Sequence, residues 1–214
     1  MQPGRTNRSQ RLKTSLGGAW STASQDYVFL ATQLFALSSH EATPKNRYSS
    51  LYVFAGLPML FAALRALLIE CNSGVFGSVR DESALARLAN EPNEQRLLEE
   101  TYQLEGDLLV KLNLLYEARN EIVHPAHRPT GTSDNTPEYM RPLKELGVLV
   151  STADPDLDYV WITQLQSHKL FRFAFETIEV VVAQVLAWHD ARDPGFRCQN
   201  LASYGRFRER EAAS

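Results

Sequence analysis

The sequence predicts an all-α protein, and three observations support this fold class. Apolar residues recur every three or four positions over much of the chain, the spacing of one face of a helix. There is no convincing set of segments with the alternation of apolar and polar residues that half-buried strands show. Apolar residues make up 44% and charged residues 22%, ordinary values for a soluble globular domain. We therefore expect an antiparallel bundle of four to five helices.

Length and charge limit the organisation of the chain. Its 214 residues fit one domain, and we expect a flexible basic arm over residues 1–20, a helical domain over 21–192 and a charged, peripheral tail over 193–214. The net charge of −3 excludes binding to nucleic acid through overall positive charge, so a contact with RNA or DNA requires a local basic cleft. Two cysteines cannot form a disulfide framework or a four-cysteine zinc site, which favours a reducing, cytoplasmic location.

The first two helices follow from apolar spacing. The first is expected over residues 24–38, with a stripe formed by Tyr27, Leu30, Leu34 and Leu37. The second is expected over residues 49–71, where Pro58 should bend the helix or mark a late start. This is the most apolar part of the chain, but Arg65 interrupts it, and we interpret it as a core helix and not as a membrane span.

The remaining elements are a short helix and two long ones. Residues 81–90 have an acidic start and form the short helix, and residues 94–123 form a long helix that Asn93 is placed to cap. The last helix is expected over 163–190, where Thr163 and Gln166 have capping-box spacing. Its buried stripe is expected to consist of Phe171, Phe175, Ile178, Val182, Val185 and Leu186.

The connection between the two long helices, residues 125–162, is rich in proline, threonine, serine and aspartate and contains one short helical segment at 142–146. A connection of this length within one domain is usually functional or mobile.

One charged residue stands in the apolar stripe of the 94–123 helix. The stripe consists of Leu108, Leu112, Leu115 and Ile122, and Arg119 occupies the position before Ile122. An unpaired buried guanidinium is very unfavourable, so Arg119 needs a partner or a wet cleft. Glu70 on the second helix is a candidate ionic partner, although a solvated or intrahelical pair is an alternative for this glutamate.

His124 follows at the end of the same helix. It precedes Pro125, and a residue before proline is biased out of the helical conformation, so the helix should end near Val123. The imidazole can then turn back over the last turn towards Arg119, with Asn120 placed to orient it. The sequence thus places a permanent cation and a side chain suited to proton transfer at one helix end.

The segment at this helix end resembles the Arg-x(4–6)-His motif of HEPN domains, because it reads Arg119-Asn120-Glu121-Ile122-Val123-His124. The likeness includes the polar residue after the arginine, the position of the motif at the end of a long helix, and a closing amphipathic helix, and it extends over residues 21–190. It implies a metal-independent endoribonuclease that uses no cofactor, acting in anti-phage defence or in a toxin–antitoxin pair. Arg119 and His124 are then catalytic, and Asn120 assists them.

The same resemblance implies partners. They are an RNA substrate such as tRNA or mRNA, a second copy of the chain with both motifs facing one cleft, and an antitoxin or regulatory protein; no membrane is implied. One departure from the family concerns regulation. Toxins that a nucleotidyltransferase controls often continue the motif as His-x-Tyr, whereas here His124 is followed by Pro125 and Ala126.

The residue types suit this chemistry. RNA carries its own nucleophile, the 2′-hydroxyl, so cleavage needs proton transfer and stabilisation of negative charge on the phosphate. Histidine transfers protons, a contribution of typically about 10²–10⁴-fold in rate. Arginine binds two phosphate oxygens at once and holds them more tightly as charge develops. Neither role needs a metal, and DNA should not be cleaved by this route.

Other interpretations remain open. Arg119 and His124 could form a buried ion pair or a cationic cap at a helix C-terminus, or the domain could bind RNA, a nucleotide or a partner protein without catalysis. A purely structural helical protein is a third reading. His124 and His127 form a weak metal-binding pattern with no third ligand. His168 and His189 on the last helix are expected at the edge of the core or on the surface, although His168 could line the cleft.

Overall fold

The computed structural model describes residues 22–90, 94–124, 136–150, 161–198 and 201–212. Within these ranges the backbone is helical and contains no named strand, only an isolated bridge between Ser49 and Ser167. The all-α expectation is therefore confirmed for the described residues. The helices are α2 (Ala23–Glu41), α3 (Tyr52–Asn72), α4 (Glu82–Asn90), α5 (Gln95–Glu100), α6 (Gly106–Val123), α7 (Met140–Glu145), α8 (Trp161–Gln164), α9 (His168–Arg192) and α10 (Leu201–Ala212), with a 3-10 turn at Pro44–Asn46.

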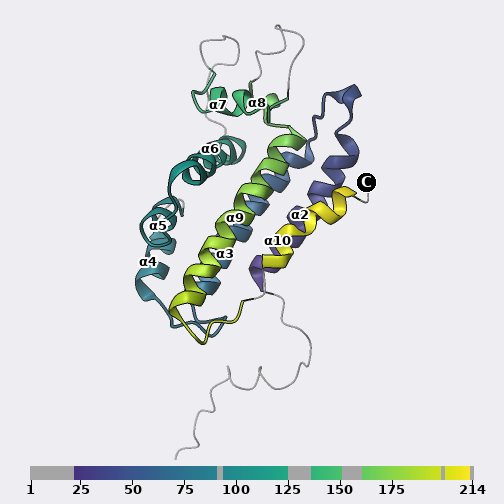
Figure 1. Ribbon diagram of the computed structural model, residues 1–214. Helices are drawn as coiled ribbons and strands as arrows, with labels where there is room; N and C mark the ends of the chain where they lie inside the picture. The colour runs from purple at the N-terminus through teal and green to yellow at the C-terminus, as the bar shows by residue number, and fades with distance from the viewer. Residues whose placement is uncertain (1–21, 91–93, 125–135, 151–160, 199–200, 213–214) are drawn as a thin grey trace, which may run out of the picture.

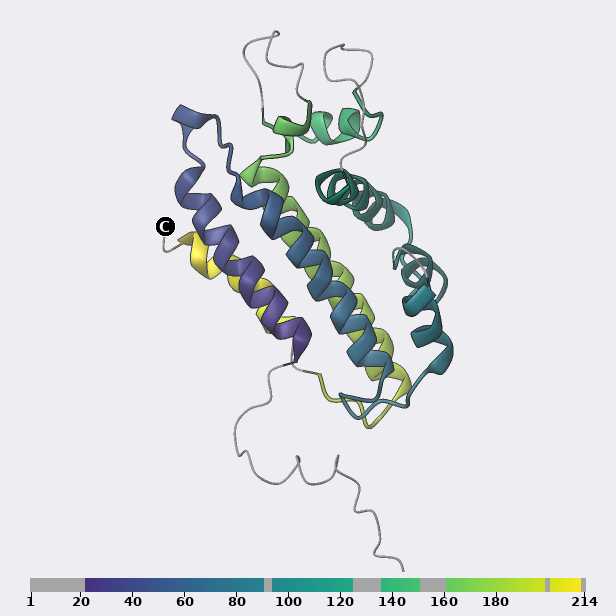
Figure 2. The ribbon, with the colours of Figure 1, turned by 180° about the vertical axis from the view of Figure 1, so that it is seen from behind.

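The long helices form two layers (Figures 1 and 2). Helices α2 and α3 run side by side in one layer, and α10 and α9 lie behind them in the other, as seen in Figure 2. Helix α6 packs against α3 and α9 at one side of this arrangement, and α4 and α5 continue along the same side. The short helices α7 and α8 lie at the end of the molecule where α9 begins (Figure 1).

Four phenylalanine rings fill the space between the two layers. Phe35 of α2 contacts the other three rings at centroid distances of 5.3–5.5 Å. The other three are Phe171 and Phe175 of α9 and Phe207 of α10. Gly56 of α3 allows this packing, because a Cβ atom at that position would lie 2.1 Å from the Phe171 ring. The centre of the core is therefore aromatic and joins all four long helices of the two layers.

The buried face of α2 differs from the predicted one. Tyr27, Leu30 and Leu37 are exposed and Leu34 is half-buried. The residues that face the core are instead Ser24, Val28, Ala31, Thr32, Phe35 and Ser38. Helix α2 carries apolar residues on nearly all sides, so apolar spacing alone does not define its inner face. The small side chains of Ser24, Ala31 and Ser38 allow close packing on the rest of the molecule.

Helix α3 begins at Tyr52 and continues through Pro58, so the proline neither ends the helix nor marks its start. By length and composition α3 is also sufficient to cross a membrane, and half of its most apolar stretch is buried inside the molecule. Its inner face carries Leu57, Leu60, Leu64 and Leu67, which are fully buried. This helix supplies as many buried aliphatic residues as α9, in line with the interpretation of this segment as a core helix.

The single long helix predicted over residues 94–123 is wrong, because the chain forms two helices there. Helix α5 ends at Glu100 and α6 begins at Gly106. Between them Gln103 and Gly106 adopt left-handed backbone angles, with φ of 56° and 59°. The side-chain amide of Gln184 on α9 holds this turn by donating to the carbonyl oxygens of Tyr102 and Gln103. Asn93, the expected cap, lies outside the described residues.

The last long helix begins later than predicted. Residues Trp161–Gln164 form the separate helix α8, and Ser167 caps α9 by accepting a hydrogen bond from the Leu170 backbone N–H. The capping box proposed for Thr163 and Gln166 is therefore wrong. The buried stripe of α9 is confirmed, since all six predicted residues are buried: Phe171, Phe175, Ile178, Val182, Val185 and Leu186.

The segment after Pro194 is not a peripheral tail. Residues 201–212 form α10, which packs on α2 and α9, and the side chains of Tyr204 and Phe207 are fully buried. The short helices predicted at 81–90 and 142–146 correspond to α4 and α7. The basic arm over residues 1–20 and most of the 125–162 connection lie outside the described residues.

Candidate functional site

The three predicted site residues lie together at the C-terminal end of α6. Arg119 and Asn120 are in the last turns of the helix, and His124 is its C-cap residue. The His124 backbone leaves the helical region, with φ −130° and ψ 67°, while its N–H still donates to the Asn120 carbonyl oxygen at 2.7 Å. The helix therefore ends where the Pro125 signal in the sequence predicts that it should.

Arg119 is half-buried, and a hydrogen bond to the side chain of Asn120 holds its guanidinium in place. Its Nη1 donates to Oδ1 of Asn120 at 2.8 Å. Its Nε is enclosed and has no hydrogen-bond partner in the part of the chain that the structure describes. A buried guanidinium N–H without an acceptor is unfavourable. Arg119 thus retains donor capacity that the described residues do not use.

The side of α6 next to Arg119 is fixed by a buried polar network. Tyr116 donates its hydroxyl hydrogen to Oε2 of Glu94 at 2.6 Å, and Arg65 of α3 forms an ion pair with Oε1 of the same carboxylate at 2.5 Å. Arg65 also donates to the Leu88 carbonyl oxygen. The Tyr116 ring packs on Phe61 of α3. These contacts hold α6 against α3 three residues before Arg119.

The charges in this network act on Tyr116. Complete burial raises the pKa of the Tyr116 hydroxyl well above its usual value, and the Glu94 carboxylate raises it further. The positive charge of Arg119 acts in the opposite direction and lowers the pKa. Arg119 therefore lies within electrostatic reach of a neutral, hydrogen-bonded tyrosine.

Glu70 is not the partner of Arg119. Its carboxylate accepts hydrogen bonds from the backbone N–H and the hydroxyl of Ser24 on α2, at 3.1 and 2.5 Å. The candidate Glu70–Arg119 ion pair does not form, and the alternative of a solvated or intrahelical pair is also wrong, because Glu70 is buried and faces the α2 side of α3. Among the described residues, the Arg119 guanidinium forms its hydrogen bond with Asn120.

His124 is exposed, whereas Arg119 and Asn120 are half-buried. The structure brings the side chains of Arg119 and Asn120 into contact. No hydrogen bond joins either of these side chains to the His124 imidazole. The arrangement offers a fixed cation beside a solvent-exposed histidine at one helix end, a combination that can bind an anion and exchange a proton with it.

Two of the other histidines, His168 and His189, lie in the core. His168 is buried against the Phe35 ring, and its Nδ1 lies 3.0 Å from the Ser38 hydroxyl. His189 is buried near the other end of α9, with Nε2 3.1 Å from the Tyr102 hydroxyl. His127 lies outside the described residues, within which no group of three or more potential metal ligands gathers.

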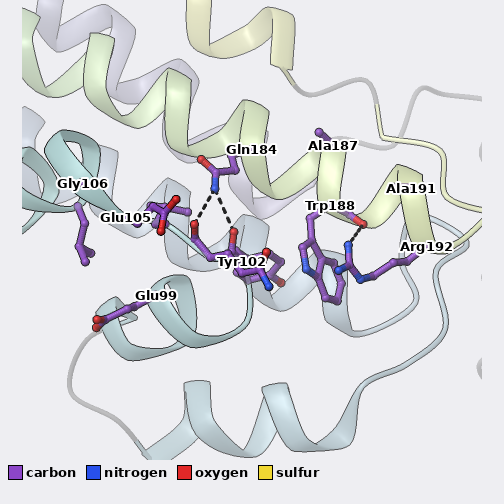
Figure 3. Close-up of a pocket in the computed structure, with 12 residues that line it drawn as sticks. Glu99, Tyr102, Glu105, Gly106, Gln184, Ala187, Trp188, Ala191 and Arg192 are labelled. Atoms are coloured by element: carbon purple, nitrogen blue, oxygen red, sulfur yellow. Dashed lines mark hydrogen bonds between the residues drawn. The ribbon is translucent and has the colours of Figure 1, made fainter.

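A pocket of about 1000 Å³, which the sequence patterns did not indicate, lies at the opposite end of α6 (Figure 3). It is lined by the α5–α6 turn and by Gln184, Trp188 and Arg192 of α9. The Arg192 guanidinium lies 4.1 Å from the centre of the Trp188 ring and donates to the Trp188 carbonyl oxygen. None of the three predicted site residues lines this pocket. The sequence gives no signal for this pocket, because its α9 residues have the pattern of an ordinary amphipathic helix and its other residues come from a turn that the sequence did not predict.

Comparisons of the chain with protein-family models, with curated proteins and with solved structures find no match.

Proposed function

We propose that this protein is a metal-independent endoribonuclease of HEPN type, built on an antiparallel bundle of four to five helices. Arg119 and His124 are its catalytic residues, and Asn120 positions Arg119. One observation carries the proposal: Asn120 holds Arg119 in the last turns of α6, the Arg119 Nε has no hydrogen-bond partner among the described residues, and an exposed histidine ends the helix five residues later. The resemblance of this segment to the HEPN motif supports the same assignment.

The local geometry supports a role for Arg119 in phosphate binding. A guanidinium has five N–H donors, and Asn120 accepts from one nitrogen only. Holding the side chain by a neighbouring amide, and not by a carboxylate, leaves its positive charge uncompensated by an ion pair within the described residues. An RNA phosphate can accept hydrogen bonds from the remaining N–H groups of Arg119, and its negative charge can pair with the guanidinium.

His124 supplies the proton transfer in this proposal. Cleavage begins when the 2′-hydroxyl of RNA loses its proton and attacks the adjacent phosphorus, and it ends when the 5′-oxygen leaves with a proton. An exposed histidine at the end of a helix can reach a bound strand and transfer protons in these steps. Arg119 stabilises the charge that develops on the non-bridging oxygens.

The biological setting follows only from the family resemblance. On that basis we propose a cytoplasmic protein of anti-phage defence or of a toxin–antitoxin pair, with tRNA or mRNA as substrate. A second copy of the chain and an antitoxin or regulatory protein are the proposed partners.

The test is RNA cleavage by the purified protein in the presence of EDTA. We expect products that end in a cyclic or 3′ phosphate, and no cleavage of a substrate with a 2′-deoxy nucleotide at the scissile position. Arg119→Ala and His124→Ala should each reduce the rate by about 10²-fold or more. Both variants should melt at the wild-type temperature.

Matched controls come from the same chain. His40 is an exposed histidine in the last turn of α2, and Arg172 is an exposed arginine of α9. His40→Ala and Arg172→Ala should retain full activity. Cleavage that persists in both site variants, or equal cleavage of the deoxy substrate, would refute the nuclease assignment.

A second candidate is a HEPN module that binds RNA, a nucleotide or a partner protein without cutting it. The observation in its favour is that no hydrogen bond joins the His124 imidazole to the side chain of Arg119 or Asn120. This candidate predicts no cleavage under any condition, weaker binding in Arg119→Ala, and unchanged binding in His124→Ala. A purely structural role instead predicts that Arg119→Met is neutral or stabilising and leaves every function intact, since apolar residues often replace buried charged groups without loss.

A further inference from the structure

The pocket at the start of α6, which we call the α5–α6 pocket, has an acidic side and an aromatic side (Figure 3). Glu99 and Glu105 line the acidic side; both are exposed, and neither forms an ion pair with another described residue. Trp188 lines the aromatic side, and the guanidinium of Arg192 lies 4.1 Å from the centre of its ring. The two carboxylates and the aromatic ring therefore belong to one cavity of about 1000 Å³.

These walls favour a ligand whose side chains are positively charged and partly aliphatic. Two carboxylates without a partner repel each other, and a cation beside them removes that repulsion. The position of Arg192 shows that the aromatic side accepts a guanidinium, as the faces of tryptophan rings generally do. The wall also includes Leu104, Leu109 and Ala187, which can pack on the methylene groups of lysine or arginine.

A peptide fits this pocket better than a metal ion or a small organic cation. The volume of the pocket is at the upper end of the range of about 300–1000 Å³ for small-molecule pockets, so it can hold several residues. The Nε1 of Trp188 is enclosed and has no hydrogen-bond partner among the described residues. The carbonyl oxygens of a peptide can accept hydrogen bonds from donors of this kind, whereas a metal ion or a fully protonated polyamine has no acceptor.

We propose that the basic arm of the same chain, residues 1–20, docks in the α5–α6 pocket and places Arg11 or Lys13 against Glu99 and Glu105. The arm contains three arginines and one lysine, and it contains no Asp or Glu. Its charge is therefore complementary to the charge of the acidic side of the pocket. The aliphatic parts of the same side chains can pack on the apolar wall.

The arm is attached at the end of the molecule where the pocket lies. Helix α2 begins where α3 and α9 end (Figures 1 and 2). Ser24 of α2 bonds to Glu70 in the last turns of α3. Asn72, the last residue of α3, donates to the hydroxyl of Tyr102, which lines the pocket. Lys13 is eleven residues before Ser24, a length of chain that can span about 35 Å, so the arm is long enough to bring Lys13 to the pocket.

Attachment to the same chain favours this contact. A tethered segment docks as if it were present at about millimolar concentration, so ion pairs that are weak between separate molecules suffice. The pocket lies at the opposite end of α6 from Arg119, and the inference uses none of the residues proposed for RNA cleavage. It therefore does not depend on the ribonuclease proposal.

Cross-linking of the full chain with a water-soluble carbodiimide tests the contact, because this reagent joins an amine to a carboxylate only when the two groups touch. The protein is purified free of nucleic acid, and isotopically labelled and unlabelled protein are mixed in equal amounts. We expect mass spectrometry to identify Lys13 joined to Glu99 or Glu105. Both joined peptides should carry the same isotope, which shows that the contact forms within one chain.

Trypsin measures how often the arm leaves the pocket, since it cleaves after Arg11 and Lys13 only while the arm is undocked. The double variant Glu99→Gln, Glu105→Gln loses both negative charges that hold the arm. It should be cleaved after Arg11 and Lys13 about fivefold faster than the wild type, or more.

A matched control removes the same charge elsewhere. Glu117 of α6 and Glu138, which precedes α7, are exposed glutamates outside the pocket. The double variant Glu117→Gln, Glu138→Gln should be cleaved in the arm at the wild-type rate. Circular dichroism establishes that both double variants fold.

Three outcomes would overturn the proposal. The first is the absence of the cross-link together with equal cleavage of the wild type and the Glu99→Gln, Glu105→Gln variant. The second is a cross-link found only between labelled and unlabelled chains, since the arm of another copy would then lie in the pocket. The third is an arm that is protected only when an RNA oligonucleotide is added, and equally so in both proteins, since the arm would then contact RNA.

Discussion

His189 lies in an aromatic enclosure between α9 and the segments around it. Its ring stacks on Phe196 at a centroid distance of 5.2 Å and meets Trp188 edge-on at 4.9 Å. Its Nε2 lies 3.1 Å from the Tyr102 hydroxyl, which also accepts a hydrogen bond from the Asn72 side chain. Burial lowers the pKa of the His189 imidazole below its usual value, although the negative charges of Asp193 and Asp81 raise it in part.

This burial predicts a pH dependence of stability. A histidine in the unfolded chain titrates near pH ~6.5, whereas folded His189 takes up its proton only at lower pH. Below about pH 6.5 the unfolded state therefore binds more protons, and the free energy of unfolding falls as the pH falls, until the folded pKa is passed. Urea denaturation at a series of pH values should show this loss in the wild type and less of it in His189→Phe. His40→Phe, at an exposed site, should retain the wild-type pH dependence; an unchanged dependence in His189→Phe would contradict the assignment.

The residues at the end of α6 show which features of the site could be predicted from the sequence. The position of Arg119 in an apolar stripe and the helix end before Pro125 are local signals, and the structure agrees with both. The pairing of Glu70 is not a local signal, because its partner Ser24 is 46 residues away in the chain. Partners of this kind depend on how two helices rotate about their axes, which no spacing within one helix determines.

At the scale of the elements, the turn between α5 and α6 separates what was predicted as one helix. The turn uses left-handed backbone at Gln103 and Gly106. Glycine adopts this conformation without strain, whereas a side chain with a Cβ is disfavoured by about 1–2 kcal/mol. No atom lies within 4 Å of a Cβ built on Gly106, so a substitution there tests backbone conformation and not crowding.

Gly106→Ala should lower the free energy of unfolding by about 1 kcal/mol, because alanine is strained at this backbone angle. Gly106→Asn should lower it less, since asparagine tolerates the left-handed region better than other residues with a Cβ. Chemical denaturation of the two variants measures the difference. If alanine were as stable as glycine at this position, residues 101–106 would not adopt the turn described here.

Helix α2 shows how far apolar periodicity predicts an element. Its existence and approximate bounds follow from the sequence, but its inner face does not, because Val28, Ala31 and Phe35 form a stripe as good as the one chosen. In α9 only one side is strongly apolar, and there the predicted stripe is the buried one. A helix face can therefore be predicted where the opposite side is polar.

At the scale of the whole molecule, α10 completes the second layer. The sequence after residue 194 is rich in charge, and its two buried aromatics, Tyr204 and Phe207, are three residues apart and easily read as isolated. Their environment is supplied by α2 and α9, which are distant in the sequence. The Phe207 ring stacks on Phe175 at 5.0 Å and meets Phe35 edge-on at 5.5 Å. The C-terminal helix is thus part of the core.

Phe207→Ala should lower the free energy of unfolding by about 3–5 kcal/mol, as is typical when a fully buried phenylalanine is truncated. Arg206→Ala, at the adjacent exposed position of α10, should change it by no more than about 0.5 kcal/mol. Thermal denaturation should show a melting temperature roughly 10 °C lower for Phe207→Ala, since 1 kcal/mol corresponds to about 2–4 °C in a domain of this size. Equal stability of the two variants would mean that α10 is not packed as described. Because α6 and α10 lie on opposite sides of the α3–α9 pair, Phe207→Ala should leave RNA cleavage unchanged at temperatures where the protein remains folded (Figures 1 and 2).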